Sequence, residues 1–104
     1  MKLPRRYYKQ REKSVLQHPF SMQRLQNLYD LAWRMIVPYN DDGTAYNDAA
    51  EYIMYLRGLT EGLGLSYSSA WQSNDHFINA FNKSLNTSNP KKGFKVFRKE
   101  LLKR

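Results

Sequence analysis

Apolar side chains in this chain recur at steps of three and four residues, which is the spacing of one face of an α-helix. The clearest stripe follows Ser21 and consists of Met22, Leu25, Tyr29, Ala32 and Ile36. Ser21 is a suitable N-cap residue, and Pro38 ends the pattern because proline cannot continue a helix. The sequence therefore predicts a helix over residues 21–37.

Two further helices are predicted in the middle of the chain. A helix over residues 47–61 is indicated by Asp48 and Glu51, which have the spacing of a capping box. A helix over residues 68–86 is indicated by apolar side chains at helical steps, although residues 73–75 offer caps for a shorter helix that begins there.

The last predicted helix covers residues 90–103 and has two unlike faces. Asn89 is its expected cap and Pro90 its first residue. Apolar side chains lie on one face, namely Phe94, Phe97 and Leu101. Lysines lie on the other, namely Lys92, Lys95, Lys99 and Lys103. The segment is a basic amphipathic helix.

A chain of 104 residues has room for one core. We expect this core to contain Leu25, Tyr29, Ala32, Ile36, Ile53, Leu56, Phe77 and Phe81. No β-hairpin dipeptide lies between alternating runs, and no internal repeat or low-complexity segment occurs. The predicted fold class is all-α: a single domain of about four helices over residues 20–104, preceded by a basic, irregular arm over residues 1–19.

Positive charge is concentrated at the two ends of the chain. The formal net charge is +8. Residues 1–13 hold six Lys or Arg against one Glu, and residues 91–104 hold seven against one Glu, whereas the stretch between them has more acidic than basic residues. Two basic ends on a mildly acidic body favour a polyanionic partner, but solvated tails that keep a small protein soluble explain the same charge.

The chain has few residues or motifs that could support catalysis or metal binding. The chain has no Cys, which excludes disulfide scaffolds, zinc fingers and thiol catalysis and permits a cytoplasmic location. Its two histidines, His18 and His76, have no partner at catalytic spacing, and no nucleotide or hydrolase motif occurs. The longest apolar run, Tyr52–Leu56, is too short to span a membrane. We therefore expect no enzyme activity, no cofactor, no metal site and no membrane insertion.

The most specific local pattern is Leu59–Gln72. It combines a predicted helix end, Gly64 at a turn, Leu65 directly after it, and a serine-rich start to another helix. These are the features that a helix-turn-helix requires. A plain corner between two helices explains the same residues.

This segment resembles the turn and recognition-helix start of helix-turn-helix DNA-binding regulators. The run Gly64-Leu65-Ser66-Tyr67, followed by Ala70-Trp71, is most similar to the molybdate-responsive type. The resemblance implies that Tyr67, Ser68, Ser69 and Gln72 face a DNA groove, with Ala70 packed inward. No basic residue lies between Gly64 and Lys83, so the phosphate contacts would have to come from the two ends of the chain.

Two functions from different classes are compatible with this sequence. The leading one is a small nucleic-acid-binding regulator or accessory factor, with DNA favoured over RNA. The side chains expected to contact phosphates or to stack on bases are Arg5, Arg6, Tyr7, Tyr8, Lys9, Arg11, Lys92, Lys95, Lys99 and Lys103. The alternative is a non-enzymatic inhibitor or adaptor of a larger nucleic-acid-handling host enzyme, of the kind that small phage and other mobile-element proteins often are. The sequence leaves self-association open.

Overall fold

The computed structural model describes residues 5–17, 21–39, 43–63 and 74–102. These ranges contain α-helices and a short 3₁₀ helix, and they contain no strand. The α-helices are α1 (Arg5–Gln17), α2 (Met22–Ile36), α3 (Gly43–Asp48), α4 (Ala50–Gly62), α5 (Asn74–Ser84) and α6 (Pro90–Leu101). The 3₁₀ helix, Val37–Tyr39, directly follows α2. The predicted all-α fold class is confirmed.

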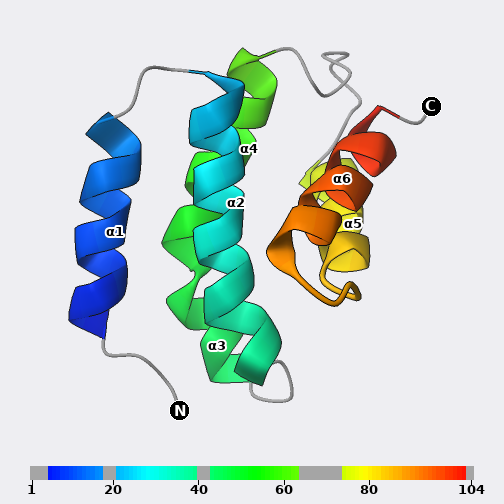
Figure 1. Ribbon diagram of the computed structural model, residues 1–104. Coiled ribbons are helices and arrows are strands. Elements are labelled where there is room, and N and C mark those ends of the chain that lie inside the picture. Colours follow the sequence, from blue (N-terminus) through cyan, green and yellow to red (C-terminus); the bar gives the residue numbers. More distant parts are fainter. Residues whose placement is uncertain (1–4, 18–20, 40–42, 64–73, 103–104) are drawn as a thin grey trace.

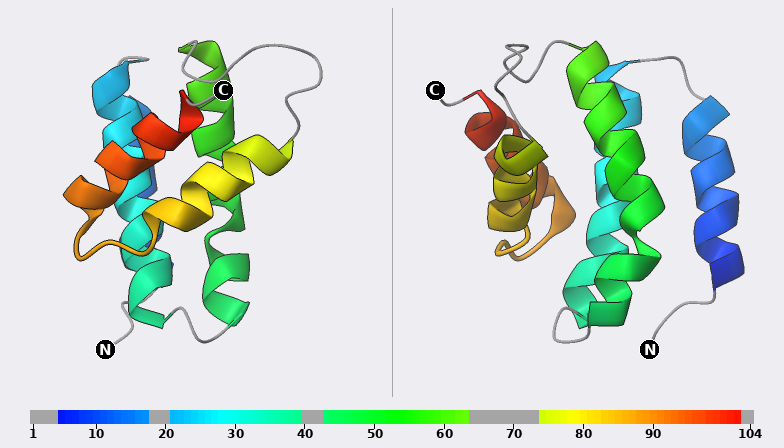
Figure 2. Two further views of the ribbon diagram at one scale, coloured as in Figure 1. Left: turned by 90° about the vertical axis from the view of Figure 1, so that its right-hand side faces the viewer. Right: turned by 180° about the vertical axis from the view of Figure 1, so that it is seen from behind.

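The helices form three layers (Figure 1). α2 and α4 run side by side in the middle layer, with α3 at one end of it. α1 lies against one side of this layer, and the pair formed by α5 and α6 lies against the other side, as the view from behind also shows (Figure 2). α2 is the central element, because it contacts α1, α4 and α6.

The central helix α2 forms as its sequence predicts. The Ser21 side chain accepts a hydrogen bond from the Arg24 backbone N–H at 3.3 Å, which satisfies one of the free donors of the first turn. Every predicted core residue is buried, namely Leu25, Tyr29, Ala32, Ile36, Ile53, Leu56, Phe77 and Phe81. The apolar spacing therefore predicted the inward face of the chain correctly.

The prediction of an irregular arm over residues 1–19 was wrong, because Arg5–Gln17 forms helix α1. Tyr8 and Glu12, four residues apart, face inward and are only 2% and 8% exposed. Among the side chains of α1 that the structure describes, the inward ones are thus one aromatic ring and one carboxylate, and a carboxylate does not count in a search for apolar residues.

The helix predicted over residues 47–61 is divided between two helices, and the N-cap of the second is Ala49 instead of the predicted Asp48. Asp48 ends α3, and α4 follows after Ala49, which makes no side-chain cap. The backbone N–H of Ala49 donates to the Ala45 carbonyl at 3.2 Å, and that of Ile53 donates to the Ala49 carbonyl at 3.0 Å. Helical hydrogen bonding thus continues across the junction, and no side-chain acceptor is needed there.

The third predicted helix corresponds to α5, which begins at Asn74, the later of the two starts that the sequence offered. Residues 68–73 of that prediction lie outside the described ranges. α5 ends at Ser84, whose hydroxyl donates to the Phe81 carbonyl at 2.5 Å. α1, and the division into α3 and α4, bring the described α-helices to six instead of about four.

Tyr29 of α2 fixes the position of α5 and α6. Its ring stacks on Phe97 at a centroid distance of 5.3 Å and also contacts Phe81 (5.9 Å) and Phe94 (5.5 Å). Its hydroxyl donates to Ser84 Oγ at 2.6 Å. Two residues of α5 and two of α6 therefore meet on one side chain of the central helix.

Candidate nucleic-acid interface

Helix α6 begins with the cap that its sequence predicts. The Asn89 side chain accepts a hydrogen bond from the Lys92 backbone N–H at 2.9 Å, and Pro90 occupies the first turn. The apolar side of the helix is buried, namely Gly93, Phe94, Phe97 and Leu101. At the C-terminal end, His76 Nε2 of α5 donates to the Leu101 carbonyl at 2.9 Å. The orientation of α6 is therefore fixed along its whole length.

The outer side of α6 carries five exposed cationic residues, which we call the α6 face: Lys91, Lys92, Lys95, Arg98 and Lys99. None of the five forms an ion pair within the part of the chain that the structure describes. Glu100, the one acidic residue of α6, turns away from this face and pairs with Lys83 of α5 at 3.4 Å. Positive charge on the α6 face is thus free to meet an external anion.

Three of the four lysines predicted in this region belong to the α6 face, and Lys103 lies outside the described residues. Lys91 and Arg98 enlarge the face beyond the prediction. Both lie at the edge of the lysine stripe at 100° per residue, so a wider arc on the helical wheel would have found them. The Arg98 guanidinium lies 6.0 Å from the centroid of the Phe94 ring, a contact that holds its side chain along the helix.

Helix α1 exposes a second, smaller cationic surface, which we call the α1 face: Arg6, Tyr7, Arg11 and Lys13. Arg6 and Lys13 are seven residues apart, so they project from the same side of the helix about two turns apart. Tyr7 is 38% exposed, and its ring packs edge-on against Tyr8 at 5.4 Å. This surface combines cations with one accessible aromatic ring.

The structure changes the part that two N-terminal residues, Tyr8 and Lys9, can play. Tyr8 is only 2% exposed, so its ring is not available to stack on a base. Lys9 is half-exposed, but its charge is already paired with two carboxylates. The Arg5 side chain is not among the described ones.

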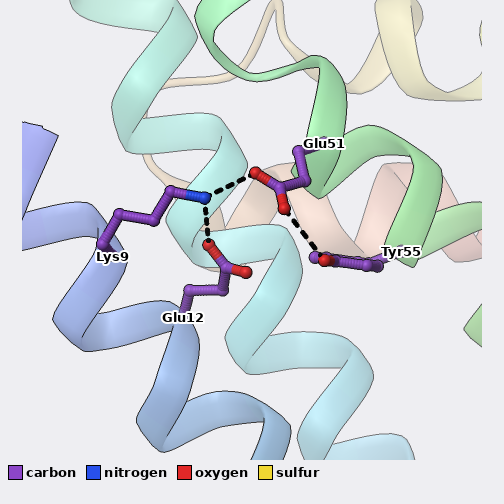
Figure 3. A network of polar contacts seen from close by, with 4 residues as sticks. All are labelled: Lys9, Glu12, Glu51 and Tyr55. Carbon is purple, nitrogen blue, oxygen red and sulfur yellow. Dashed lines mark hydrogen bonds and ion pairs between the residues drawn. The ribbon is translucent and has the colours of Figure 1, made fainter.

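The pairing of Lys9 joins α1 to α4 (Figure 3). Lys9 Nζ lies 2.6 Å from Glu51 Oε2 and 3.3 Å from Glu12 Oε2. The Tyr55 hydroxyl donates to Glu51 Oε1 at 3.0 Å. Sequence analysis missed this cluster, because Lys9 and Glu51 lie 42 residues apart and meet only when α1 packs against the middle layer.

This cluster acts as a clamp and keeps Lys9 protonated. The hydrogen bond to Glu51, and to a smaller extent the one to Glu12, raises the pKa of Lys9 above its ordinary value. Through this contact with Glu51, the charged Lys9 side chain links α1 to α4.

The pKa shifts of Lys9, Tyr29 and Tyr52 predict that the protein becomes less stable at alkaline pH. Burial, followed by the negative charge of Glu12, raises the pKa of Tyr52 to about 12, and burial also raises the pKa of Tyr29. Together with Lys9, these groups hold their protons more tightly in the folded chain than in the unfolded chain. The free energy of unfolding should therefore be unaffected by them below about pH 10 and fall as the pH rises from there toward about 12.

Urea unfolding monitored by circular dichroism at a series of alkaline pH values measures this loss. Tyr52→Phe should flatten the pH dependence, because it removes one of the titrating groups. A urea midpoint that stays constant between about pH 9 and pH 12 would contradict the assignment.

The helix-turn-helix candidates Ser68, Ser69 and Gln72 lie outside the described residues, as does the turn at Gly64. The described part of that segment is the last turn of α4. There Thr60 is 1% exposed, and its hydroxyl donates to the Arg57 carbonyl at 2.8 Å. A buried Thr is tolerated at this position because its polar atom is satisfied by the backbone.

An apolar groove of about 270 Å³ lies between α4 and α5 on the surface of the middle layer. It is lined by Tyr46, Asn47, Ala50, Ile53, Met54, Arg57, Phe77 and Ile78. Met54 is 72% exposed, the largest exposed fraction among the large apolar side chains that the structure describes. Sequence patterns did not reveal the groove, because its walls come from separate helices.

Within the described ranges, no three His, Cys, Asp or Glu side chains are grouped to hold a metal ion. No helix in those ranges has the length and apolar content needed to cross a membrane. Comparison of the chain with protein-family models, with curated proteins and with solved structures finds no match.

Proposed function

We propose that this protein binds nucleic acid through the α6 face, as a small regulator or accessory factor of the cytoplasm with a binding role and no catalytic one. The observation that supports the proposal is the set of five exposed cations on one rigidly held helix, free of intramolecular ion pairs within the described residues. Lysine and arginine at such positions neutralise phosphates and release condensed counterions, which drives sequence-independent binding.

Duplex DNA is the favoured ligand. A helix with a basic outer side can lie along the phosphates that border the major groove of B-DNA, which is wide enough to admit it. The major groove of duplex RNA is deep and narrow, and side chains cannot enter it. A lipid surface is a poorer partner, because insertion needs an exposed apolar side and that side of α6 is buried.

The proposal predicts a defined change in the salt dependence of binding. Lys92→Gln combined with Lys95→Gln should weaken binding to duplex DNA and make the log–log slope against salt shallower by about 1.8, which is about 0.9 for each lost phosphate contact. The loss should be similar for different sequences, since phosphate contacts carry no sequence information. Fluorescence anisotropy of a labelled duplex over a series of salt concentrations measures both quantities.

A matched control removes the same charge from the middle layer. Arg34 pairs with Asp30, and Arg57 pairs with Glu61, each at 3.1 Å, so Arg34→Gln with Arg57→Gln should leave the slope unchanged. Equal effects of the two double variants would show that net charge alone matters and would contradict an interface on α6. Absence of binding to any nucleic acid at about 50 mM salt would overturn the proposed function.

The second candidate is the inhibitor or adaptor of a nucleic-acid-handling host enzyme, of phage or other mobile-element type. The apolar groove with exposed Met54 favours it, because a solvent-facing apolar hollow is typical of protein contacts. In this role the basic ends would occupy the nucleic-acid channel of the enzyme. One result distinguishes the two candidates. The leading candidate must bind free DNA at low salt, whereas an inhibitor of this kind does not need to.

A further inference from the structure

We infer that one molecule of this protein bridges two separate segments of duplex nucleic acid, one on the α6 face and one on the α1 face. This inference rests on the proposed function and adds a second binding surface to it. The observation that carries it is the placement of the two cationic surfaces on opposite outer layers of the fold (Figures 1 and 2).

The layered arrangement prevents one straight duplex from touching both surfaces. α1 and α6 both pack on α2, and all views place them on different sides of it. With a usual spacing of 8–10 Å between packed helices, the axes of α1 and α6 are about 16–20 Å apart. Each helix buries its inner side, Tyr8 on α1 and Phe97 on α6, so the cationic sides point away from each other.

The middle layer offers no cationic track between the two surfaces. α2 and α4 together contain three arginines and three acidic residues, so their net charge is zero. Arg34 and Arg57 are engaged in ion pairs with acidic residues of their own helices. A single strand that wrapped from one surface to the other would meet no net positive charge on the way, which favours two independent ligands.

The α1 face is held firmly enough to act as a surface in its own right. The Lys9 clamp fixes α1 to α4, and buried Tyr8 fixes it to the core. The three cations of the α1 face are fewer than the five of the α6 face. The first duplex should therefore occupy α6, and the second should bind α1 more weakly and dissociate at lower salt.

A two-duplex capture assay tests the inference. A biotinylated duplex is fixed on beads, the purified protein is added at about 50 mM salt, and a second, fluorescent duplex is then offered. We expect recovery of the fluorescent duplex to require the protein. Arg6→Gln combined with Arg11→Gln and Lys13→Gln should reduce this recovery to the level without protein while the variant still binds the first duplex. Thermal unfolding of the variant checks that these exposed substitutions leave the fold intact.

The control variant with Arg34→Gln and Arg57→Gln should keep the second duplex. Protein that stays on the bead duplex but never recovers the second one overturns bridging and leaves the proposed function standing. Recovery by the α1 variant equal to that of the unchanged protein would mean that self-association joins the duplexes, and it also overturns the inference. Protein that does not bind even the bead duplex defeats the proposed function, and bridging with it.

Discussion

Phe81→Ala is expected to lower the free energy of unfolding by about 3–5 kcal/mol, the usual cost of truncating a fully buried phenylalanine. Phe81 has no exposed surface, and its ring lies within 6.4 Å, centroid to centroid, of four other aromatic rings. These rings belong to α2, α3, α5 and α6, so a cavity at this point cannot be closed by a shift of one helix. Urea unfolding followed by circular dichroism gives the difference.

Met54→Ala is the matched control for this truncation. It also removes a large apolar side chain, but from a position that is 72% exposed, and its effect should stay within about 0.5 kcal/mol. Similar losses for the two variants would contradict a core centred on Phe81.

Gly93→Ala is expected to destabilise the protein by about 1–3 kcal/mol, although Ala is the better helix former by about 1 kcal/mol. A Cβ atom on Gly93 would lie 2.6 Å from the Tyr29 hydroxyl oxygen and 2.8 Å from Thr87 Oγ1. It would also lie 3.0 Å from the Ser84 carbonyl oxygen, which is backbone and cannot rotate away. The methyl group would push α6 off α2 and stretch the hydrogen bond between Tyr29 and Ser84.

Gly58→Ala, in the interior of α4, should have the opposite sign. Nothing lies within 4 Å of a Cβ built on Gly58, so Ala should stabilise the helix by about 0.5–1 kcal/mol. Thermal or urea unfolding of the two variants under identical conditions makes the comparison. Stabilisation by both substitutions would show that helix propensity, and not close packing at Gly93, decides the outcome.

Helices with their own cap and a continuous apolar stripe could be predicted from the sequence. α2 follows Ser21 and α6 follows Asn89, and both side chains accept the expected backbone hydrogen bond. In these segments, local preference and tertiary burial require the same residues, so a pattern search suffices.

Helix α1 could not be predicted in that way. Among its described side chains, the inward ones are one tyrosine and one glutamate, and the lysine that pairs with the glutamate also contacts Glu51 of α4. Such a helix depends on the partner surface that α2 and α4 provide. Packing supplies most of the stability of a short helix, and periodicity in sequence does not record packing of this kind.

Only part of the candidate interface could be predicted from the sequence. Counting charges located the positive residues at both ends of the chain, and three lysines of the predicted stripe, Lys92, Lys95 and Lys99, are exposed on α6. Counting could not show that Lys9 is paired with Glu12 and Glu51, or that α1 and α6 lie in different layers. Both facts are products of tertiary packing between segments far apart in sequence.

The convergence of α5 and α6 on Tyr29 has a consequence for the order in which the fold opens. Phe81, Phe94 and Phe97 share one ring, so separating either C-terminal helix from α2 exposes the aromatic surface of the other. These three helices should therefore open as one cooperative unit. α1 lies on the other side of α2 and takes no part in these aromatic contacts, so the cohesion of the C-terminal unit should not depend on whether the Lys9 clamp is intact.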